Sequence, residues 1–156
     1  MTMRPLLLAN PSPAKRHGVR YSFVIRATHD GVRKVQQDCD SLLDAHQVTP
    51  DIANAIRIVF AEALNNIVEH AYDGQSDGTI CLRVWISENT IRFRITDFGL
   101  ALPGKKLPIS CFPDIDVPKN ELPEGGFGWP LIHALVQHLS YQCRNGWNIL
   151  QFQIDR

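Results

Sequence analysis

The stretch EALNNIVEHAY, residues 62–72, places a cluster of polar side chains inside a segment that is otherwise apolar. Around this stretch, apolar residues recur every three to four positions, which is the pattern of a helix with one buried face. Thr49 and Pro50 at the start of the segment are typical of a helix N-cap and a first helical position, and Asp73-Gly74 breaks the pattern. The sequence therefore predicts a long helix from Pro50 up to this break, with polar residues that a purely structural helix does not need.

Two of these polar residues, Glu62 and Asn66, are one helical turn apart and lie at the edge of the apolar stripe. An Asn oxygen can ligate Mg²⁺, which keeps several waters and takes phosphate oxygens, and a Glu can act as general base on a hydroxyl or a water. Polar residues at the edge of an apolar stripe more often form a solvated helix flank, so this stretch alone does not decide between a flank and a functional site. Asn65, Glu69 and His70 are open to both interpretations, and a lone His near an apolar stripe is more often packed than catalytic.

The remaining pattern predicts short strands and helices around this central helix. Alternating residues on either side of Glu88-Asn89 and of Asn145-Gly146 indicate two hairpins, and Leu131, Leu135 and Leu139 have helical spacing. The expected elements besides the central helix are strands at 21–28, 79–87, 90–96, 140–144 and 147–154 and helices at 32–46 and 130–139. Runs of strands favour a mostly antiparallel sheet with helices covering one face, which is a two-layer α+β sandwich.

The composition fits one domain and gives no reason to expect a nucleic acid or a membrane as partner. The chain has 156 residues, of which 44% are hydrophobic, and its formal net charge is zero, so nothing predicts a nucleic acid or an anionic membrane as partner. No run approaches the roughly 20 apolar residues of a membrane span, and the apolar run 6–9 is too short for a signal peptide. Cys39, Cys81, Cys111 and Cys143 are far apart and form no C-x-x-C pair, which is typical of reduced thiols. We therefore expect a cytoplasmic protein.

The stretch ITDFGLALPG, residues 95–104, places Asp97 at the end of a predicted strand and Gly99 just after it. A carboxylate there can accept a hydrogen bond from an exocyclic amino group such as that of adenine, and a glycine lets backbone approach a ligand. A plain strand-ending turn explains the same residues. Asp97-Phe98-Gly99 also matches the metal-binding tripeptide of eukaryotic-type protein kinases, but the chain is too short and lacks their H-R-D-x-x-x-x-N and V-A-I-K segments.

The stretch EGGFGWPLIHAL, residues 124–135, places glycines directly before a predicted helix. Backbone N–H groups at such a helix start can bind an anion, although a flexible loop that ends in a helix cap explains the glycines as well. No Gly-Lys-Ser/Thr follows, so this is not a Walker A loop. Before it lies the segment 102–123, with five prolines and no periodicity, and a loop of this length is usually functional or mobile.

Taken in chain order, EALNNIVEHAY, ITDFG, the long loop and EGGFGWPLIHAL, followed by the closing hairpin, resemble the GHKL (Bergerat-type) ATPases. This is the superfamily of gyrase-type and histidine-kinase ATP-binding domains. Within it the chain most resembles the small stand-alone anti-sigma-factor serine/threonine kinases of bacteria (RsbW-like), over roughly residues 21–154. The resemblance implies the Bergerat-type ATP-binding fold, with residues 1–19 as a flexible N-terminal tail and residues 20–156 as a single histidine-kinase-like ATPase domain. No phosphoacceptor-histidine segment or second domain is evident, which argues against a histidine kinase or a topoisomerase fragment.

The resemblance also implies roles for individual residues. Asn66 is expected to ligate Mg²⁺, and Glu62 is expected to be the catalytic base that activates a serine hydroxyl of a protein substrate for attack on the γ-phosphate of ATP. Asp97 is expected to bind adenine with the help of Gly99. Phosphoryl transfer depends mainly on positioning and charge stabilisation, so few residues can suffice.

By the same resemblance, the segment Gly126, Phe127 and Gly128 is expected to bind the phosphates, and Lys105 or Lys106 is expected to belong to an ATP lid. The implied partners are a STAS-type anti-anti-sigma protein, which the kinase phosphorylates, and a sigma factor or other output protein, which it sequesters. Phosphorylation adds charge at a docking surface and would release the antagonist. Members of this family are commonly homodimers.

The chain departs from the family pattern at two places. Ala101 stands where another glycine is usual, and Trp129-Pro130 stands where a leucine and a flexible residue are more usual. Neither change removes a catalytic group, but both bear on nucleotide affinity and turnover. Two alternatives are therefore kept beside the anti-sigma kinase: a non-catalytic nucleotide-binding regulatory module, and a switch kinase that acts on a STAS scaffold protein.

Overall fold

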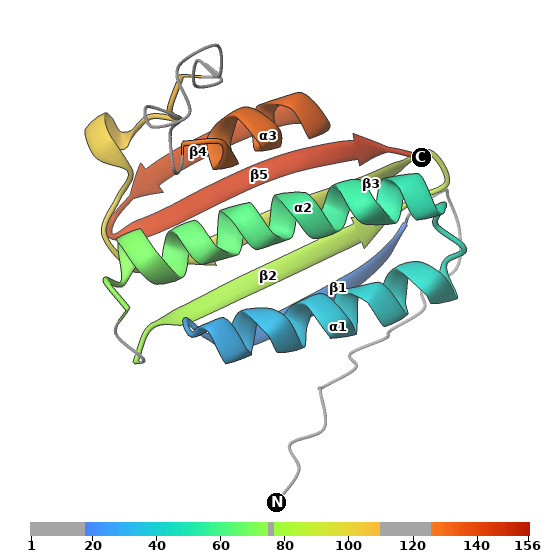
Figure 1. The fold of residues 1–156 in the computed structure, drawn as a ribbon, viewed down its shortest axis with the longest axis horizontal. Helices are drawn as coiled ribbons and strands as arrows, with labels where there is room; N and C mark the ends of the chain where they lie inside the picture. The colour runs from blue at the N-terminus through green and yellow to red at the C-terminus, as the bar shows by residue number, and fades with distance from the viewer. Residues whose placement is uncertain (1–17, 75–76, 110–125) are drawn as a thin grey trace, which may run out of the picture.

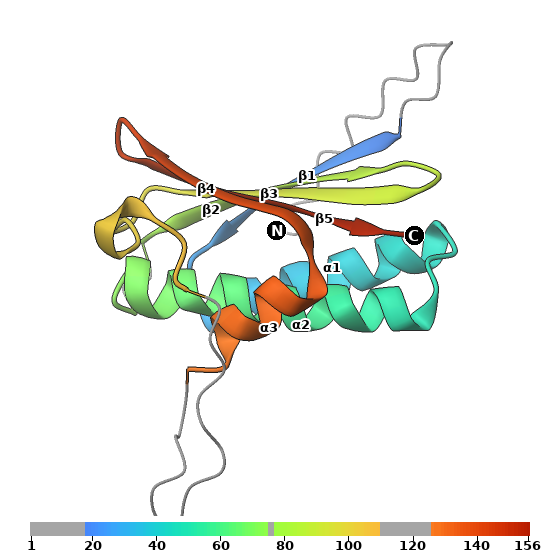
Figure 2. The same ribbon diagram turned by 90° about the horizontal axis from the view of Figure 1, so that it is seen from above.

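The computed structural model describes residues 18–74, 77–109 and 126–156, which form a five-stranded sheet and three α-helices (Figure 1). The strands are β1 (Val19–Arg26), β2 (Thr79–Ile86), β3 (Thr90–Asp97), β4 (Gln137–Arg144) and β5 (Trp147–Asp155), and the helices are α1 (His29–Ala45), α2 (Pro50–Asn66) and α3 (Gly128–Leu135). The sheet order is β1-β2-β3-β5-β4, and every neighbouring pair is antiparallel. Figure 2 shows all three helices on one side of the sheet, which confirms the predicted two-layer α+β sandwich.

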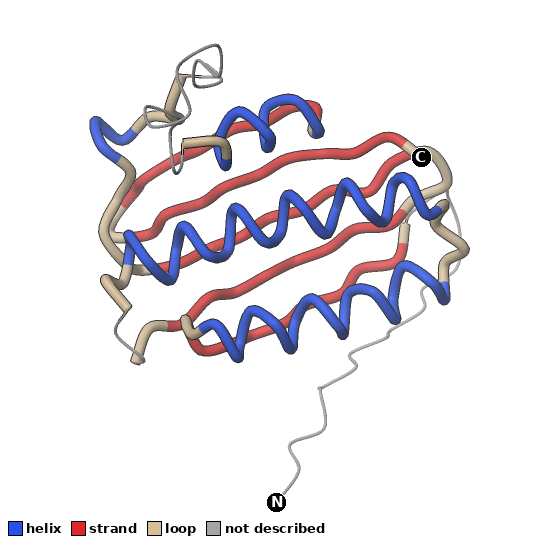
Figure 3. Tube along the Cα trace, in the orientation of Figure 1, coloured by secondary structure: helices blue, strands red, loops and turns tan. Residues whose placement is uncertain are grey.

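The hydrophobic core lies between the sheet and the helices. Along β2 and β3 every second residue is buried and its neighbours are more exposed, because successive side chains point to opposite faces of a sheet. At the centre, the ring of Phe60 from α2 packs edge-on against Phe93 and Phe152, with centroids 5.0 and 6.4 Å away. The helix predicted from its apolar stripe therefore covers the middle of the sheet, as Figure 3 also shows.

The helix predicted at residues 130–139 is wrong at both ends, because α3 begins at Gly128 and ends at Leu135. Val136 is extended (φ −124°, ψ 158°), and Gln137 already pairs with Gln153 of β5. Leu139 has helical spacing from Leu135, but it packs its side chain on the core from strand β4. Pairing with the sheet thus overrides a local helical pattern.

Two helix boundaries also differ from the prediction. Thr28 is not the last residue of a strand but the N-cap of α1, where its side-chain oxygen accepts a 3.1 Å hydrogen bond from the amide of Gly31. The predicted central helix is α-helical only to Asn66, and Ile67–Ala71 form a π-helical turn. At its start Pro50 holds the first helical position as predicted, whereas the Thr49 side chain makes no capping bond.

Several predictions concern residues outside the described ranges. These include most of the predicted tail 1–19, although Val19 already belongs to β1, and residues 110–123 of the long loop. The described start of that loop holds a 3₁₀ turn, Pro103–Lys105. Among the described residues, no helix is long and apolar enough to cross a membrane.

Candidate functional site

A cleft of about 510 Å³ opens where the end of α2 meets the segment after β3, the start of α3 and the inner face of β4 and β5. Most of its wall is apolar, with Leu100, Leu102 and Trp129 among the lining residues. A few polar side chains, Asn66, Asp97 and Asn148, also line it. An apolar pocket of this size with a few placed polar groups is typical of a site for a small organic ligand.

The predicted catalytic base, Glu62, and the predicted magnesium ligand, Asn66, lie on α2 beside the start of α3. A Cβ atom added to Gly128 would lie 2.5 Å from Oε2 of Glu62 and 3.8 Å from Nδ2 of Asn66. The start of α3 therefore lies in direct contact with the Glu62 carboxylate, so Gly128 and the polar edge of α2 line the same place. The structure thus brings Gly128 of α3 together with Glu62 and Asn66 of α2, which lie far from it in the sequence.

Asn66 has an unused polar group at this site. Its Nδ2 atom is buried and finds no hydrogen-bond partner among the described residues. A buried amide without a partner is costly, and rotation of the side chain can turn either its nitrogen or its oxygen toward a ligand. Asn66 therefore fits a role in which a bound molecule or ion supplies the missing partner.

Asp97 is one of two buried polar residues in the described chain, with 4% of its surface exposed. Its Oδ1 atom accepts hydrogen bonds of 2.9 Å from the Gly99 amide and from Nδ2 of Asn148. Burial raises the pKa of Asp97 above the ordinary value, and these two hydrogen bonds oppose that shift. Because among the described residues only Oδ1 is engaged, Oδ2 is left to accept a hydrogen bond from a ligand in the cleft.

Asn148 is a site residue that the sequence analysis missed, and it holds the Asp97 carboxylate in place. Its Nδ2 atom also donates to the carbonyl of Gly99 at 2.9 Å, while its Oδ1 atom accepts a 2.7 Å hydrogen bond from the Tyr141 hydroxyl. That hydroxyl in turn accepts a 3.0 Å hydrogen bond from the amide of Leu102. The signal was present in the sequence, because Asn148 stands at an inward, otherwise apolar position of an alternating strand.

Gly99 is needed for packing as well as for the site. A Cβ atom there would lie 2.5 Å from the carbonyl oxygen of Ala71, at the end of the π-helical turn. The same carbonyl accepts a 2.8 Å hydrogen bond from the amide of Leu100, and the Tyr72 hydroxyl accepts one of 2.9 Å from the amide of Phe98. The segment after Asp97 is thus fixed to the end of the central helix.

Three other predicted residues, Gly126, Phe127 and Lys105, do not line the cleft. Gly126, with a positive φ of 89°, and Phe127 directly precede α3, and the Phe127 carbonyl accepts the Leu131 amide. Lys105 is exposed in the 3₁₀ turn after Leu102. His70, which the sequence left open, is exposed and lines the cleft.

The donor set of the site fits a magnesium ion only together with a phosphate ligand. Within residues 18–74, 77–109 and 126–156, no three His, Cys, Asp or Glu side chains form a metal cage. Magnesium is usually held by one or two protein oxygens, with waters and substrate phosphates completing the octahedron. One amide oxygen from Asn66 beside an acidic residue suits that arrangement.

The sequence is similar to serine-protein kinases named RsbW. The relatives from Bacillus thuringiensis (strain Al Hakam) and Bacillus anthracis are each 31% identical over 96 residues, which is 61% of this chain and 59% of the relative. The chain therefore matches less than two thirds of the length of these curated relatives.

A crystal structure of the RsbU and RsbW domains of Rv1364c from Mycobacterium tuberculosis has the same fold. It superposes with a TM-score of 0.61 at 17% sequence identity, and the match covers 94% of this chain and 34% of the other. The predicted resemblance to RsbW-like proteins of the GHKL superfamily is confirmed by these relatives and this fold.

The family model described as the histidine kinase-like ATPase domain matches residues 25–154, a range that includes every element from α1 to β4 and all the predicted site residues. The chain belongs to the family of histidine kinase-like ATPase domains.

Proposed function

We propose that the protein is an ATP-dependent protein-serine kinase and anti-sigma-type regulator in a partner-switching pathway. The observation that carries the proposal is the meeting of Glu62, Asn66 and Gly128 beside the cleft that contains Asp97. In this proposal, Glu62 is the base, Asn66 the magnesium ligand and Gly128 part of the phosphate site, while Asp97 is the acceptor for a purine amino group. The similarity to RsbW supports the same conclusion.

In the proposed complex, Asp97 accepts a hydrogen bond from the exocyclic amino group of adenine, while the apolar wall of the cleft packs on the base. The triphosphate extends toward the start of α3, where amides of the Gly126-to-Gly128 segment and the helix dipole favour negative charge. In this proposal Lys105 belongs to an ATP lid, where its ammonium group would counter phosphate charge. A Mg²⁺ ion held by Asn66 would neutralise part of the phosphate charge.

The proposed reaction transfers the γ-phosphoryl group to a serine of a STAS-type partner. The serine oxygen bonds to the γ-phosphorus, the bond from that phosphorus to the bridging oxygen breaks, and ADP leaves. Glu62 takes the proton of the serine hydroxyl. In the same pathway, the unphosphorylated antagonist and a sigma factor or other output protein compete for the kinase, which would act in the cytoplasm as a homodimer.

The test separates nucleotide binding from catalysis. In calorimetric titration with Mg-ATP, Glu62→Gln is expected to bind with wild-type affinity, whereas Asn66→Ala is expected to lose much of its affinity. Without Mg²⁺, the two variants should bind ATP with similar affinity. With radiolabelled ATP and a STAS protein encoded beside the gene, transfer by Glu62→Gln should fall about 10²- to 10⁴-fold, the usual contribution of a general base. Transfer at the wild-type rate by Glu62→Gln would remove Glu62 from the mechanism.

The same variants decide between the proposal and its alternatives. A chain that binds Mg-ATP, transfers no phosphate and still captures the output protein is a non-catalytic regulatory module. A chain that phosphorylates a STAS scaffold and captures no sigma factor is a switch kinase. If neither the wild type nor any variant binds nucleotide, the roles proposed for Glu62, Asn66 and Asp97 are withdrawn together.

A further inference from the structure

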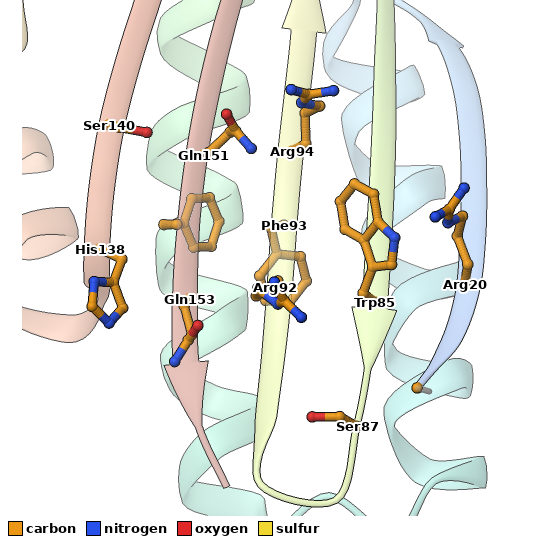
Figure 4. A pocket seen from close by; sticks show the side chains of 12 residues that line it. Arg20, Trp85, Ser87, Arg92, Phe93, Arg94, His138, Ser140, Gln151 and Gln153 are labelled. Carbon is orange, nitrogen blue, oxygen red and sulfur yellow. The ribbon is translucent and has the colours of Figure 1, made fainter. Parts of the chain in front are cut away.

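The sheet has a second face, opposite the helices, that the described residues leave bare (Figure 2). On this outer face a shallow hollow of about 820 Å³ runs across the strands. Figure 4 shows it from outside, with Arg20, Trp85, Arg92 and Arg94 along its floor and the core residue Phe93 pointing away toward the helices. The hollow lies across the sheet from the cleft of Asp97, so it is a separate site.

Two arginines of this face stand directly opposite each other, and no arginine of this face stands opposite an acid. In the β2–β3 register Arg83 stands directly opposite Arg94, and Trp85 stands opposite Arg92. Like charges directly opposite each other on a sheet destabilise it. Among the described residues, the ion pairs are Arg33 with Asp30 and Arg57 with Asp40, both on the helices, so the outer arginines form no ion pair with a described carboxylate.

A second observation shows an unmet hydrogen-bonding need on this face. The Nε atom of Arg94 is buried and has no acceptor in the described part of the chain. A buried charged donor without an acceptor is more costly than a neutral one. The fold therefore keeps a like-charge pair that an anion on the outer face could relieve. Beside it is an unpaired donor that a turn of the Arg94 side chain would offer to the same anion.

The choice of cation indicates a protein partner. The described lysines, Lys34, Lys105 and Lys106, all lie in α1 or after β3, so the described cations on this face are arginines. Arginine binds carboxylates through two parallel hydrogen bonds, and arginine and tryptophan are enriched at protein interfaces where lysine is depleted. The guanidinium of Arg20 lies 5.4 Å from the ring centre of Trp85, an arrangement that keeps this arginine extended over the hollow.

We infer that the outer sheet face docks an acidic segment of a partner protein, with its carboxylates over Arg83, Arg92 and Arg94. A nucleic acid is less suited, because the net charge of zero gives no long-range attraction to phosphates and Arg20 already covers one face of the Trp85 ring. A second copy packed through the same patch would bring arginines against arginines. The inference does not depend on the proposed kinase activity.

The test uses the whole chain and two labelled extended peptides, one with Glu at alternating positions and one with Gln in their place. The wild type should bind the Glu peptide, and Arg83→Gln/Arg94→Gln should weaken binding by about tenfold or more, as loss of close charge pairs does. The matched control, Arg33→Gln/Arg57→Gln, removes two charges from the helical face and should bind like the wild type. Raising the salt concentration should weaken the wild-type complex.

Three results would overturn the inference. Equal binding of the Glu and Gln peptides would show that charge does not direct docking. Tighter binding of a single-stranded DNA of similar length, lost in the same double variant, would assign the face to nucleic acid. A wild-type dimer in size-exclusion chromatography with light scattering that becomes a monomer in the double variant would assign it to a second copy.

A stability measurement tests the like-charge pair independently of any probe, and it uses Arg83→Gln alone so that the stem of Arg94 still packs. At low salt this variant should unfold at a higher urea concentration than the wild type, and the difference should shrink as salt is added. Arg33→Gln, which breaks an exposed ion pair, should show no such gain. A lower midpoint for Arg83→Gln at low salt would mean that the pair is not repulsive, and the inference would lose its basis.

Discussion

Asp97 is a carboxylic acid with only 4% of its surface exposed. Burial raises its pKa, so it takes up a proton closer to neutral pH than an exposed aspartate does. A protonated carboxyl is a poorer acceptor for an amino group, so ATP affinity should be constant above the raised pKa and fall as pH drops through it. The effect of pH on the stability of the nucleotide-free chain has the opposite sign. The folded state binds this proton more tightly than the unfolded state does, so the free energy of unfolding falls as pH rises through the same window. Calorimetric titration across this pH range measures the first effect, and urea unfolding the second.

Asn148→Ala tests the support of that carboxylate. The change removes a hydrogen bond that lowers the pKa of Asp97, so the pH at which ATP affinity falls should move upward. Gln151→Ala, on the outer face of the same strand, is the control and should leave the midpoint where it is in the wild type. If the midpoint is the same in Asn148→Ala and the wild type, Asn148 does not set the charge of Asp97.

Gly128→Ala tests the contact between α3 and the proposed base. The added Cβ would meet the far end of the Glu62 side chain, which can move, so the free energy of unfolding should change little while phosphate transfer falls. Because both changes act on one group, Gly128→Ala in the Glu62→Gln background should cause little further loss. Additive losses in transfer would show that Gly128 acts through something other than Glu62.

At the scale of elements, the junction between the π-helical turn and the end of β3 holds the cleft in shape. Gly99→Ala would bring a Cβ to 2.5 Å from the Ala71 carbonyl oxygen and 2.7 Å from its carbon, which are backbone atoms and cannot turn away. We expect a loss of about 1–3 kcal/mol in the free energy of unfolding, typical of overpacking, measured by urea denaturation. Adding Ala71→Gly removes only the 2.8 Å contact with the Ala71 Cβ, so it should recover only part of the loss. Full recovery would mean that the backbone contacts are not the cause.

The elements that the sequence predicted correctly are those in which local pattern and tertiary role agree. The apolar stripe of α2 and the alternation in β2 and β3 each describe one buried face, and that face is the one the core uses. The start of β4 was missed because the spacing of Leu135 and Leu139 suits a helix, whereas the pairing of Gln137 with Gln153 is non-local.

The candidate site was predictable only where a residue acts alone. Glu62, Asn66 and Asp97 could be named from their local setting and from the family resemblance. The contact of Gly128 with Glu62 and the bonds from Asn148 to Asp97 join positions that only the folded sheet brings together.

For the whole molecule, bound nucleotide should stabilise the fold, and a buried thiol can report it. Burial, with the nearby charges of Asp38 and Asp40, raises the pKa of Cys39 to about 12, so its thiolate is rare at neutral pH. Cys81 and Cys143 are free and partly exposed, so an alkylating reagent should modify them long before Cys39. Peptide mapping measures the extent of reaction at each cysteine. At about 100 times its Kd, Mg-ATP should raise the free energy of unfolding by about 2.7 kcal/mol and slow the Cys39 reaction accordingly. Unchanged Cys39 alkylation in the presence of bound nucleotide would show that this thiol reacts through a local opening.

The π-helical turn makes the spacing of the cleft depend on chain length as well as on side chains. The Tyr72 amide bonds back to Ile67, five residues earlier, so this turn holds one residue more than an α-helical turn would. Deleting a single residue from it would let the α-helix continue and leave Glu62 and Asn66 where they are. Tyr72, whose hydroxyl spans from Thr79 to Phe98, would rotate by about 100° around the helix axis. A chain could thus keep every side chain of the site and still lose the contact between Tyr72 and the segment after β3. An insertion or deletion in this turn would therefore change the cleft without changing any residue that lines it.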